Sequence, residues 1–198
     1  MNLISKLGRL ALTTSGLLLT AALPALAQEP AGIPAKAVTC LACHGSSGAA
    51  PMQPEYPRLA GQTSRYLYLQ LRDFQEGRRA SPLMTPMAVG LSRDDMHELA
   101  DYFSAQKPWP QTFVTDPDKA RLGKAKADET LCTMCHQGGF TGQNEIPRLT
   151  GQNYAYLVKQ LSDFKARRRT NDAGNMTSVS NTLSDADIEN LAHFINGL

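Results

Sequence analysis

The sequence has only four cysteines in 198 residues, and beyond its N-terminus it has neither a long apolar run nor a stretch in which apolar and polar residues alternate. Without a further run of about 20 apolar residues, the chain has no second candidate for a membrane span. The missing alternation argues against half-buried β-strands, and we expect an all-α fold. All four cysteines fall within two short motifs, so none is left over for another site.

The N-terminal 27 residues are typical of a secretory signal peptide. Lys6 and Arg9 give it a basic start, Leu10–Leu23 form an apolar core, and Ala25-Leu26-Ala27 supplies small residues suited to cleavage. The core spans about fourteen residues, fewer than the ~20 needed to cross a bilayer, although an uncleaved anchor is the alternative. We predict export to the periplasm and cleavage after about Ala27. The mature protein is then soluble or only peripherally associated with a membrane.

The charges of the chain are close to balance. The sequence has 20 basic and 18 acidic residues, and the signal peptide takes away two basic residues and no acidic one, which leaves 18 of each. A balanced polypeptide has no strongly basic surface with which to attract nucleic acid. We therefore expect no nucleic-acid partner.

Two five-residue segments, 92 residues apart, share the pattern Cys-x-x-Cys-His: Cys40–His44 and Cys132–His136. In a helix, residues at i, i+3 and i+4 share one face, so the two thiols and the imidazole would point the same way. The thiols can then add to the two vinyl groups of one porphyrin, while the histidine reaches its iron. This pattern is the attachment signature of a c-type haem. It predicts two covalent haem c groups, with the following residues as attachment points and iron ligands: Cys40, Cys43, His44, Cys132, Cys135 and His136.

Three other interpretations of the cysteines are weaker. A zinc site built from all four would have to close over the 88 residues between the two pairs, whereas zinc ribbons close over roughly 15–20. A thioredoxin-like redox motif would follow an apolar β-branched strand, which neither copy does. Plain disulfides would not require a histidine directly after the second cysteine of each pair.

The two motifs belong to an internal repeat with an offset of 90 to 92 residues. Pro57–Gln62 recurs as Pro147–Gln152, and a run with helical apolar spacing follows each copy. Ser92 and Ser184 then begin Ser-x-x-Asp motifs, which are typical of helix N-termini. The helices that follow have apolar residues at i, i+3, i+4 and i+7. These residues are Met96, Leu99, Ala100 and Phe103 in the first half, and Ile188, Leu191, Ala192 and Ile195 in the second.

The repeat predicts two helical domains of about eighty residues each. Lys107-Pro108-Trp109-Pro110 suits neither a helix nor a strand, so it marks the boundary. Asp116-Pro117 suits an N-cap followed by the first helical residue. A domain of this size has a marginal apolar core, which a covalent porphyrin would complete. We divide the chain into a signal peptide at 1–27, a first domain at 28–107, a linker at 108–116 and a second domain at 117–198.

A haem iron that carries electrons rather than binding substrate needs a second axial ligand besides histidine, and methionine in that position raises the reduction potential. Met84 lies 40 residues after His44, and Met176 lies 40 residues after His136. Six residues and then Leu-Ser follow each methionine. The repeat thus predicts Met84 and Met176 as the second axial ligands. The alternative is that both side chains simply pack in a core.

The remaining methionines and histidines do not share this spacing. Met87 matches Val179 in the repeat and is expected at a haem edge, whereas Met96 lies on the apolar face of its helix and is expected in the core. The others are expected in loops or on polar surfaces away from the iron: Met52, Met134, His97 and His193.

Several further residues have two open interpretations. Pro57 and Pro147 follow the haem histidines by 13 and 11 residues. Their carbonyl groups either accept a hydrogen bond from the histidine ring and fix its tautomer, or belong to prolines that simply precede a helix. Tyr66 and Tyr156 either bind a propionate or lie half-buried in a core. Arginines near these segments could pair with propionates or dock a partner, but most are expected to be solvated: Arg78, Arg79, Arg167, Arg168 and Arg169.

Taken together, these motifs resemble those of the dihaem cytochrome c4 family. The resemblance covers residues 33–198 and is most specific in the Pro-Arg-Leu-x-Gly-Gln blocks, in Thr170-Asn171-Asp172 before Met176, and in the Leu-Ser helix starts. It implies a tandem pair of class I cytochrome c domains that face each other across a pseudo-twofold axis, with propionates near the interface. It also implies thioether links at the four cysteines and axial pairs of His44 with Met84 and His136 with Met176.

The sequence departs from the family pattern at two points. Gln137 stands where the family usually has a glycine after the haem histidine, a glycine that the first half keeps as Gly45. The segment Lys124–Leu131, before the second attachment motif, is also shorter than expected. Both departures concern the exposure and the potential of the second haem rather than its ligation.

The resemblance implies a periplasmic one-electron carrier between respiratory-chain donors and a terminal oxidase or reductase. An alternative is the dihaem electron-transfer subunit of an enzyme complex, such as a flavocytochrome sulfide dehydrogenase. A catalytic dihaem enzyme is disfavoured, because a thiosulfate dehydrogenase-like site would need a spare cysteine and a dihaem peroxidase would need an open iron. We therefore expect an electron-transfer protein and not an enzyme.

Overall fold

The described part of the chain is helical throughout. The computed structural model describes residues 32–108 and 113–198, and within them it contains helices, turns and one isolated β-bridge between Gln143 and Ile146, but no strand. The all-α prediction is therefore confirmed. No helix in these two ranges is long and apolar enough to cross a bilayer. The predicted signal peptide at 1–27 and positions 109–112 of the predicted linker lie outside the described residues.

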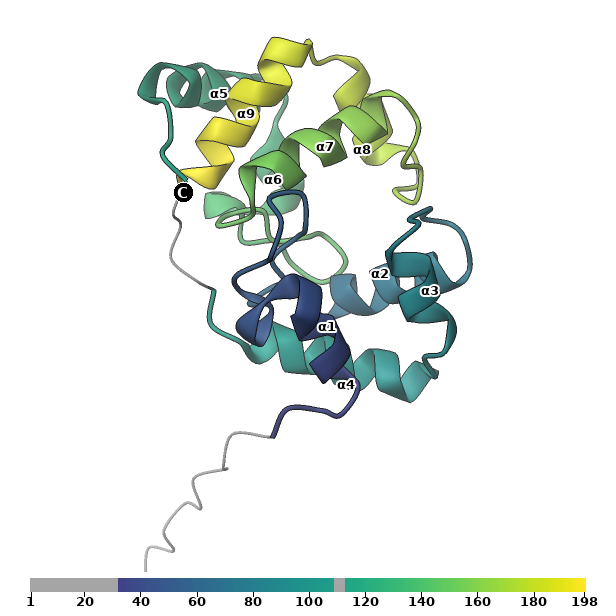
Figure 1. The fold of residues 1–198 in the computed structure, drawn as a ribbon. Helices are drawn as coiled ribbons and strands as arrows, with labels where there is room; N and C mark the ends of the chain where they lie inside the picture. The colour runs from purple at the N-terminus through teal and green to yellow at the C-terminus, as the bar shows by residue number, and fades with distance from the viewer. Residues whose placement is uncertain (1–31, 109–112) are drawn as a thin grey trace, which may run out of the picture. The chain divides into compact units, whose positions relative to one another are not determined.

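The helices follow the order of the sequence repeat (Figure 1). The first repeat contains α1 (Ala37–His44), η1 (Ser46–Gly48), α2 (Ser64–Gln75), α3 (Met84–Val89) and α4 (Arg93–Ala105). The second repeat contains α5 (Pro117–Glu129), α6 (Cys132–His136), η2 (Gly138–Phe140), α7 (Tyr154–Lys165), α8 (Asn175–Asn181) and α9 (Asp185–Asn196). Within residues 32–108 no helix is the counterpart of α5, and most of the positions equivalent to α5 at an offset of 92 lie before residue 32, outside the described residues.

Side-chain caps fix where α4, α5 and α9 begin. Ser92 and Ser184 each form a complete capping box with the aspartate three residues on, so two backbone N–H groups are satisfied at the start of α4 and again at the start of α9. Asp116 accepts hydrogen bonds from two N–H groups of the first turn of α5, and Pro117 is the first helical residue. These predicted helix starts are confirmed.

Each repeat has an apolar core of its own. In the first repeat the buried face of α4 packs against α1 and α2, with Met96 and Leu99 almost fully buried. In the second repeat the buried face of α9 packs against α5 and α7, with Ile188 and Leu191 in the equivalent places. The apolar spacing of both helices is therefore confirmed as a core pattern. Residues 33–198 nevertheless form one compact unit, so the division at 108–116 stays a prediction.

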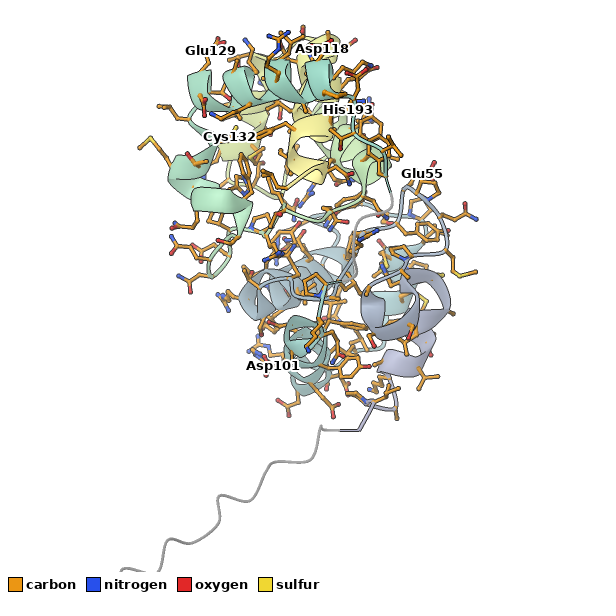
Figure 2. The ribbon with its side chains drawn as sticks, turned by 90° about the vertical axis from the view of Figure 1, so that its left-hand side faces the viewer. Glu55, Asp101, Asp118, Glu129, Cys132 and His193 are labelled. Atoms are coloured by element: carbon orange, nitrogen blue, oxygen red, sulfur yellow. The ribbon has the colours of Figure 1, made fainter. Side chains whose placement is uncertain are left out.

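Helices α5 and α9 cross in close contact in the second repeat. Asp118 and Glu129 mark the two ends of α5, and Cys132 follows just beyond it (Figure 2). At the crossing, a Cβ atom on Gly123 would come within 2.0 Å of the backbone oxygen of Asn190. Only glycine lets the two backbones approach this closely.

Candidate haem-binding sites

The first attachment motif forms the end of α1. Cys40 is half-buried, Cys43 is exposed, and His44 is buried at the last position of the helix. The chain then turns at Gly45, with φ 76°. A Cβ atom at this position would lie 1.9 Å from the backbone oxygen of Ala50, so the turn requires glycine. The predicted sharing of one helix face by the two thiols and the imidazole is therefore realised.

The second motif forms a short helix of its own, α6, whereas the first motif forms the end of the longer helix α1. Leu131 adopts a left-handed conformation (φ 56°) and separates α6 from α5. Cys132 is half-buried, Cys135 is exposed and His136 is buried, as in the first motif. Gln137 repeats the backbone conformation of Gly45, with φ 66° and ψ 166°. That region of backbone space is almost confined to glycine, so Gln137 is strained.

The cysteines are available for attachment. All four are free thiols, and burial raises the pKa of Cys40 and of Cys132, which keeps both protonated. Within the described ranges, no group of three or more histidine, cysteine or acidic side chains converges on a point that could hold a metal ion. The two cysteine pairs therefore do not come together as the zinc interpretation requires.

Hydrogen bonds set the tautomer of both motif histidines. His44 Nδ1 lies 2.8 Å from the carbonyl oxygen of Pro57, and His136 Nδ1 lies 3.0 Å from that of Pro147. A carbonyl oxygen can only accept, so each Nδ1 carries the proton and each Nε2 keeps its lone pair. Burial lowers the pKa of both histidines, an effect that the hydrogen bond only partly opposes, so both rings stay neutral. The first interpretation of the two prolines is the one that the structure bears out.

This donor set fits a c-type haem. A neutral imidazole whose Nε2 is free and whose Nδ1–H is held by a carbonyl is the arrangement of a histidine that ligates a metal. Two free thiols precede it in sequence, by one and by four residues, on the same helix face. Both attachment motifs have these features, so each could hold one porphyrin.

The two candidate methionines begin the short helices α3 and α8. Met84 is the first residue of α3, its backbone N–H donates to Ser81 Oγ at 3.1 Å, and its side chain is half-buried. Met176 is the second residue of α8 and is also half-buried. Next to it, the N–H of Thr177 donates to Asp172 Oδ2 at 2.7 Å, which fixes the start of that helix.

Met96, Met52 and Met134 are buried or exposed as predicted, whereas the haem-edge position of Met87 stays a prediction. Met96 is 1% exposed in the core, whereas Met52 and Met134 are largely exposed. Met87 is 43% exposed and lies three residues after Met84 on α3.

One of the two surface predictions for histidine is wrong. His97 is exposed and stacks on Tyr68, as expected for a polar helix face. His193 is only 8% exposed, because Phe113 and Asp116, in the segment before α5, lie against it. Its ring packs against Phe113 and Tyr154, and its Nδ1 accepts a hydrogen bond from the backbone N–H of Asp116 at 3.2 Å.

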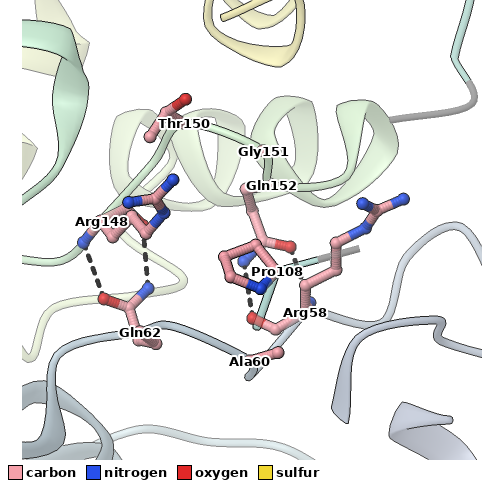
Figure 3. A pocket seen from close by; sticks show the side chains of 8 residues that line it. All are labelled: Arg58, Ala60, Gln62, Pro108, Arg148, Thr150, Gly151 and Gln152. Atoms are coloured by element: carbon pink, nitrogen blue, oxygen red, sulfur yellow. Dashed lines mark hydrogen bonds between the residues drawn. The ribbon is translucent and has the colours of Figure 1, made fainter. Parts of the chain in front are cut away.

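Two buried glutamines join the repeats, and sequence reasoning did not single them out. Gln62 of the first repeat accepts from the backbone N–H of Arg148 at 2.7 Å and donates to its carbonyl at 2.8 Å. Gln152 of the second repeat does the same to Arg58, at 2.7 and 2.9 Å (Figure 3). Both glutamines occupy the last position of the repeated Pro-Arg-Leu-x-Gly-Gln block, which is the signal that could have found them.

A second polar network also crosses between the repeats. Arg79 donates to Tyr156 OH at 3.0 Å, and Arg169 donates to Tyr66 OH at 3.1 Å. Both guanidinium groups are buried, and each also donates to the amide oxygens of Gln70 and Gln160. Burial alone would raise the pKa of Tyr66, but the charges of Arg169 and Arg79 outweigh it and lower the pKa.

This network revises the interpretation of the arginines and tyrosines. Arg78, Arg167 and Arg168 are exposed or partly exposed, so the expectation that most are solvated holds for these three. Arg79 and Arg169 are the two exceptions. The pairing of Tyr66 and Tyr156 with arginines of the opposite repeat could be recognised only once the two repeats lay face to face.

Known proteins share these features. A family model described as cytochrome c matches residues 120–198. Over 196 aligned residues the chain is 38% identical to a cytochrome c4 of Pseudomonas aeruginosa, with 92% of this chain and 96% of that protein covered. A crystal structure of reduced recombinant cytochrome c4 from Pseudomonas stutzeri has a TM-score of 0.76 at 38% identity, covering 82% of this chain and 95% of that chain. This likeness confirms the predicted tandem of class I cytochrome c domains.

A relative with a different description is similar over a comparable length. A thiosulfate dehydrogenase electron acceptor of Thiomonas intermedia is 35% identical over 175 residues, which are 83% of this chain and 81% of that protein. The cytochrome c4 of Pseudomonas aeruginosa matches with higher identity and covers more of both chains. Sequence identity, the common fold and the two attachment motifs all agree, and the chain belongs to the cytochrome c4 family of electron-carrying c-type cytochromes.

Proposed function

We propose that this protein is a dihaem carrier that moves one electron at a time in the periplasm, between respiratory-chain donors and a terminal oxidase or reductase. The observation that carries the proposal is the state of the two motif histidines. Each is neutral, buried and hydrogen-bonded through Nδ1, so that Nε2 is free to bind iron. The signal-like N-terminus supports the periplasm as the place of function.

When bound, haem supplies a ferric–ferrous couple at each site. In our assignment Cys40 and Cys43 would hold the first haem through thioether bonds, and His44 and Met84 would bind its iron. Cys132 and Cys135 would hold the second haem, and the residues at equivalent places in the repeat, His136 and Met176, would bind its iron. With two protein ligands for each iron, the sites would leave no position open for a substrate, and the haems would supply one-electron redox chemistry. The role is therefore transfer and not catalysis.

The protein supplies rigidity as well as ligands. The hydrogen bond from each histidine to a proline carbonyl fixes the ring plane, and Cys40 and Cys132 each pack against the apolar core of their own repeat. We assign one haem to residues 28–107 and the other to residues 117–198, so that each porphyrin completes the core of one repeat.

A second candidate is the electron-acceptor subunit of an enzyme. The likeness to a thiosulfate dehydrogenase electron acceptor favours this role, with an enzyme that oxidises a sulfur compound as the donor. A flavocytochrome sulfide dehydrogenase would be a donor of the same kind. The rate of haem reduction separates the two roles. It would be measured after rapid mixing with each purified enzyme and its substrate, and after mixing with membranes that oxidise quinol. Faster reduction by an enzyme favours the subunit role, and faster reduction by the membranes favours the respiratory role.

Haem content and reactivity test the proposal. The mass of the mature protein should equal that of the polypeptide after cleavage near Ala27 plus two haem groups, and haem quantification should give two per chain. Cyanide or peroxide added to the protein should produce no fast spectral change, because no axial position is open. A colourless mature protein after normal export, or a rapid response of either haem, would contradict the proposal.

A further inference from the structure

Each motif histidine binds one end of a peptide group whose other end is held by a glutamine of the opposite repeat. The carbonyl of Pro57, which accepts from His44 Nδ1 at 2.8 Å, and the N–H of Arg58 belong to the same peptide group. That N–H donates to Oε1 of Gln152 at 2.7 Å. The peptide, which we call the Pro57–Arg58 bridge, thus connects a histidine of the first repeat to a side chain of the second.

The second histidine has an equivalent connection in the opposite direction. The carbonyl of Pro147 lies 3.0 Å from His136 Nδ1, and the N–H of Arg148, in the same peptide group, donates to Oε1 of Gln62 at 2.7 Å. We call this peptide the Pro147–Arg148 bridge. Figure 3 shows the glutamine end of both connections, with Gln62 bonded to Arg148 of the second repeat and Gln152 bonded to Arg58 of the first.

The glutamine amides have only one orientation that satisfies their neighbours. Gln62 and Gln152 are 5% and 6% exposed. Each Oε1 accepts from two N–H groups, that of the bridge and that of the next residue in its own chain, Thr63 or Asn153. Each Nε2 donates to the carbonyl of the bridged arginine. A flipped amide would put a donor against two donors, so the acceptor end is fixed toward the bridge.

Hydrogen bonds in series strengthen one another in a buried environment. When the bridge N–H donates to the glutamine, the peptide is polarised and its carbonyl oxygen becomes a better acceptor for the histidine Nδ1–H. A stronger bond at Nδ1 makes the imidazole a better electron donor at Nε2. A better donor stabilises ferric over ferrous iron, and so lowers the reduction potential of the haem that the histidine would bind.

We propose that Gln62 and Gln152 are positioning residues that act across the interface, each setting the reduction potential of the haem held by the opposite repeat. Gln62 acts on the haem at His136, and Gln152 acts on the haem at His44. This inference rests on the proposed axial roles of these two histidines.

Replacing each glutamine by methionine removes the amide while keeping a side chain of similar length. In the Gln62→Met holoprotein we expect the potential of the His136 haem to rise and that of the His44 haem to stay the same. In Gln152→Met the pattern should be reversed. The potentials are followed in a redox titration by NMR, with the axial-methionine methyl signals assigned beforehand from the single variants Met84→Ala and Met176→Ala.

The histidine Nδ1 proton gives a readout that does not depend on electron transfer. In the reduced Gln62→Met protein, the Nδ1–H resonance of His136 should move upfield as its hydrogen bond weakens, and that of His44 should not move. Thr63→Val is the matched control. It removes another hydrogen bond between the repeats, from Thr63 Oγ1 to the carbonyl of Asn144, and with it the cap that the same oxygen gives to the N–H of Tyr66 at the start of α2. It keeps the backbone N–H of residue 63 that donates to Gln62, and it changes neither Pro57–Arg58 nor Pro147–Arg148. It should leave both potentials and both resonances in place.

The outcomes separate this inference from the proposed function. A shift of the His44 haem in Gln62→Met, an equal shift of both haems, or no shift at all in a protein with normal spectra would overturn the inference. Shifts of the haem potentials in Thr63→Val as large as those in Gln62→Met would also overturn it, because they would indicate general loosening of the interface. If the unmodified holoprotein lacked the spectra of histidine–methionine haems, the proposed function would fail before any variant was compared.

Discussion

His193 is a residue that the sequence predicts at the surface and that the structure buries against Phe113 and Tyr154. Its Nδ1 accepts from the backbone N–H of Asp116, which is possible only while that nitrogen is unprotonated. The free energy of unfolding should therefore depend on whether the His193 imidazole is charged.

We predict that His193 makes the folded holoprotein less stable in mild acid. Burial lowers the pKa of His193 below its ordinary value of 6.5, and Lys119 lowers it further, against the opposing effect of Asp116 and Glu189. The unfolded chain then takes up the proton first, so the contribution is complete above pH 6.5 and is lost as the pH falls from there through the folded-state pKa.

The measurement is the free energy of unfolding on either side of pH 6.5 for the unmodified protein and for His193→Asn. Asparagine can still accept from the Asp116 N–H but does not titrate. The variant should lose less stability than the unmodified protein as the pH falls. Identical pH dependence in the two proteins would remove His193 as the cause.

Gln137 gives a prediction about backbone strain. Its φ of 66° and ψ of 166° belong to a region that glycine adopts freely, and the strain of another residue there is about 1–3 kcal/mol. Gln137→Gly should raise the free energy of unfolding by about 1 kcal/mol, after the greater flexibility of glycine in the unfolded chain is subtracted. Gln137→Ala should bring no gain, because alanine is strained in the same way. A lower free energy of unfolding in Gln137→Gly would show that the backbone of Gln137 is not strained.

The residues that can be predicted from sequence are those whose partners are fixed by local spacing. The cysteine–histidine motifs show helical spacing, and the repeat alone identifies Met84 and Met176 as a matched pair. His193, Arg79 and Gln62 escape this reasoning, because their environments are made by segments distant in sequence. The segment before α5 folds over His193, and the opposite repeat covers the other two.

Helices α4 and α9 can be predicted from the sequence because each carries its own start signal and its own apolar spacing, whereas α1, α3, α6, α7 and α8 have no side-chain cap. The capping boxes of α4 and α9 and the Asp116 cap of α5 are local features, and the buried faces of α4 and α9 agree with the spacing. The break between α5 and α6 was not predicted. It depends on the left-handed conformation of Leu131, and a leucine gives no indication of such a conformation in the sequence.

The crossing of α5 and α9 gives a prediction about packing. Alanine at position 123 would gain up to about 1 kcal/mol in helix propensity. Its Cβ would, however, lie 2.0 Å from the backbone oxygen of Asn190, so the two helices would have to separate. We expect Gly123→Ala to lower the free energy of unfolding by about 1–3 kcal/mol, as overpacking does.

Denaturant unfolding of the holoprotein checks this packing effect against a matched variant. A Cβ atom added at Gly90 would meet no other atom within 4 Å, and the φ of Gly90 is negative, so Gly90→Ala should change stability little. Equal stability of Gly123→Ala and the unmodified protein would show that the two helices tolerate separation.

For the molecule as a whole, the main feature is two apolar cores joined by polar contacts. The apolar cores of the two repeats share no residue. The contacts between the repeats include the hydrogen bonds of Gln62 and Gln152 to the opposite repeat, and those of the buried Arg79 and Arg169. Hydrogen bonds of this kind are costly to break singly, because the partners that remain are buried and unsatisfied. The repeats should therefore unfold together as long as this network is intact.

We predict that Arg79→Met lowers the free energy of unfolding by about 2–3 kcal/mol, because the hydroxyl of Tyr156 and two glutamine oxygens lose a buried donor. The exposed Arg167 is the matched control, and Arg167→Met should change stability by less than about 0.5 kcal/mol. In the double variant Arg79→Met/Arg169→Met, denaturation should broaden or split into two steps. Equal effects of Arg79→Met and Arg167→Met would contradict the structural role of the network.

The assignment of one histidine and one methionine to each of two haems has a decisive test in an optical redox titration. The unmodified holoprotein should contain two haems per chain and show ferric spectra of histidine–methionine coordination for both. Met84→Ala and Met176→Ala should each lose that signature for one haem, whose potential falls, while the other haem keeps its spectrum and potential. Unchanged spectra and potentials in either variant would contradict the assignment.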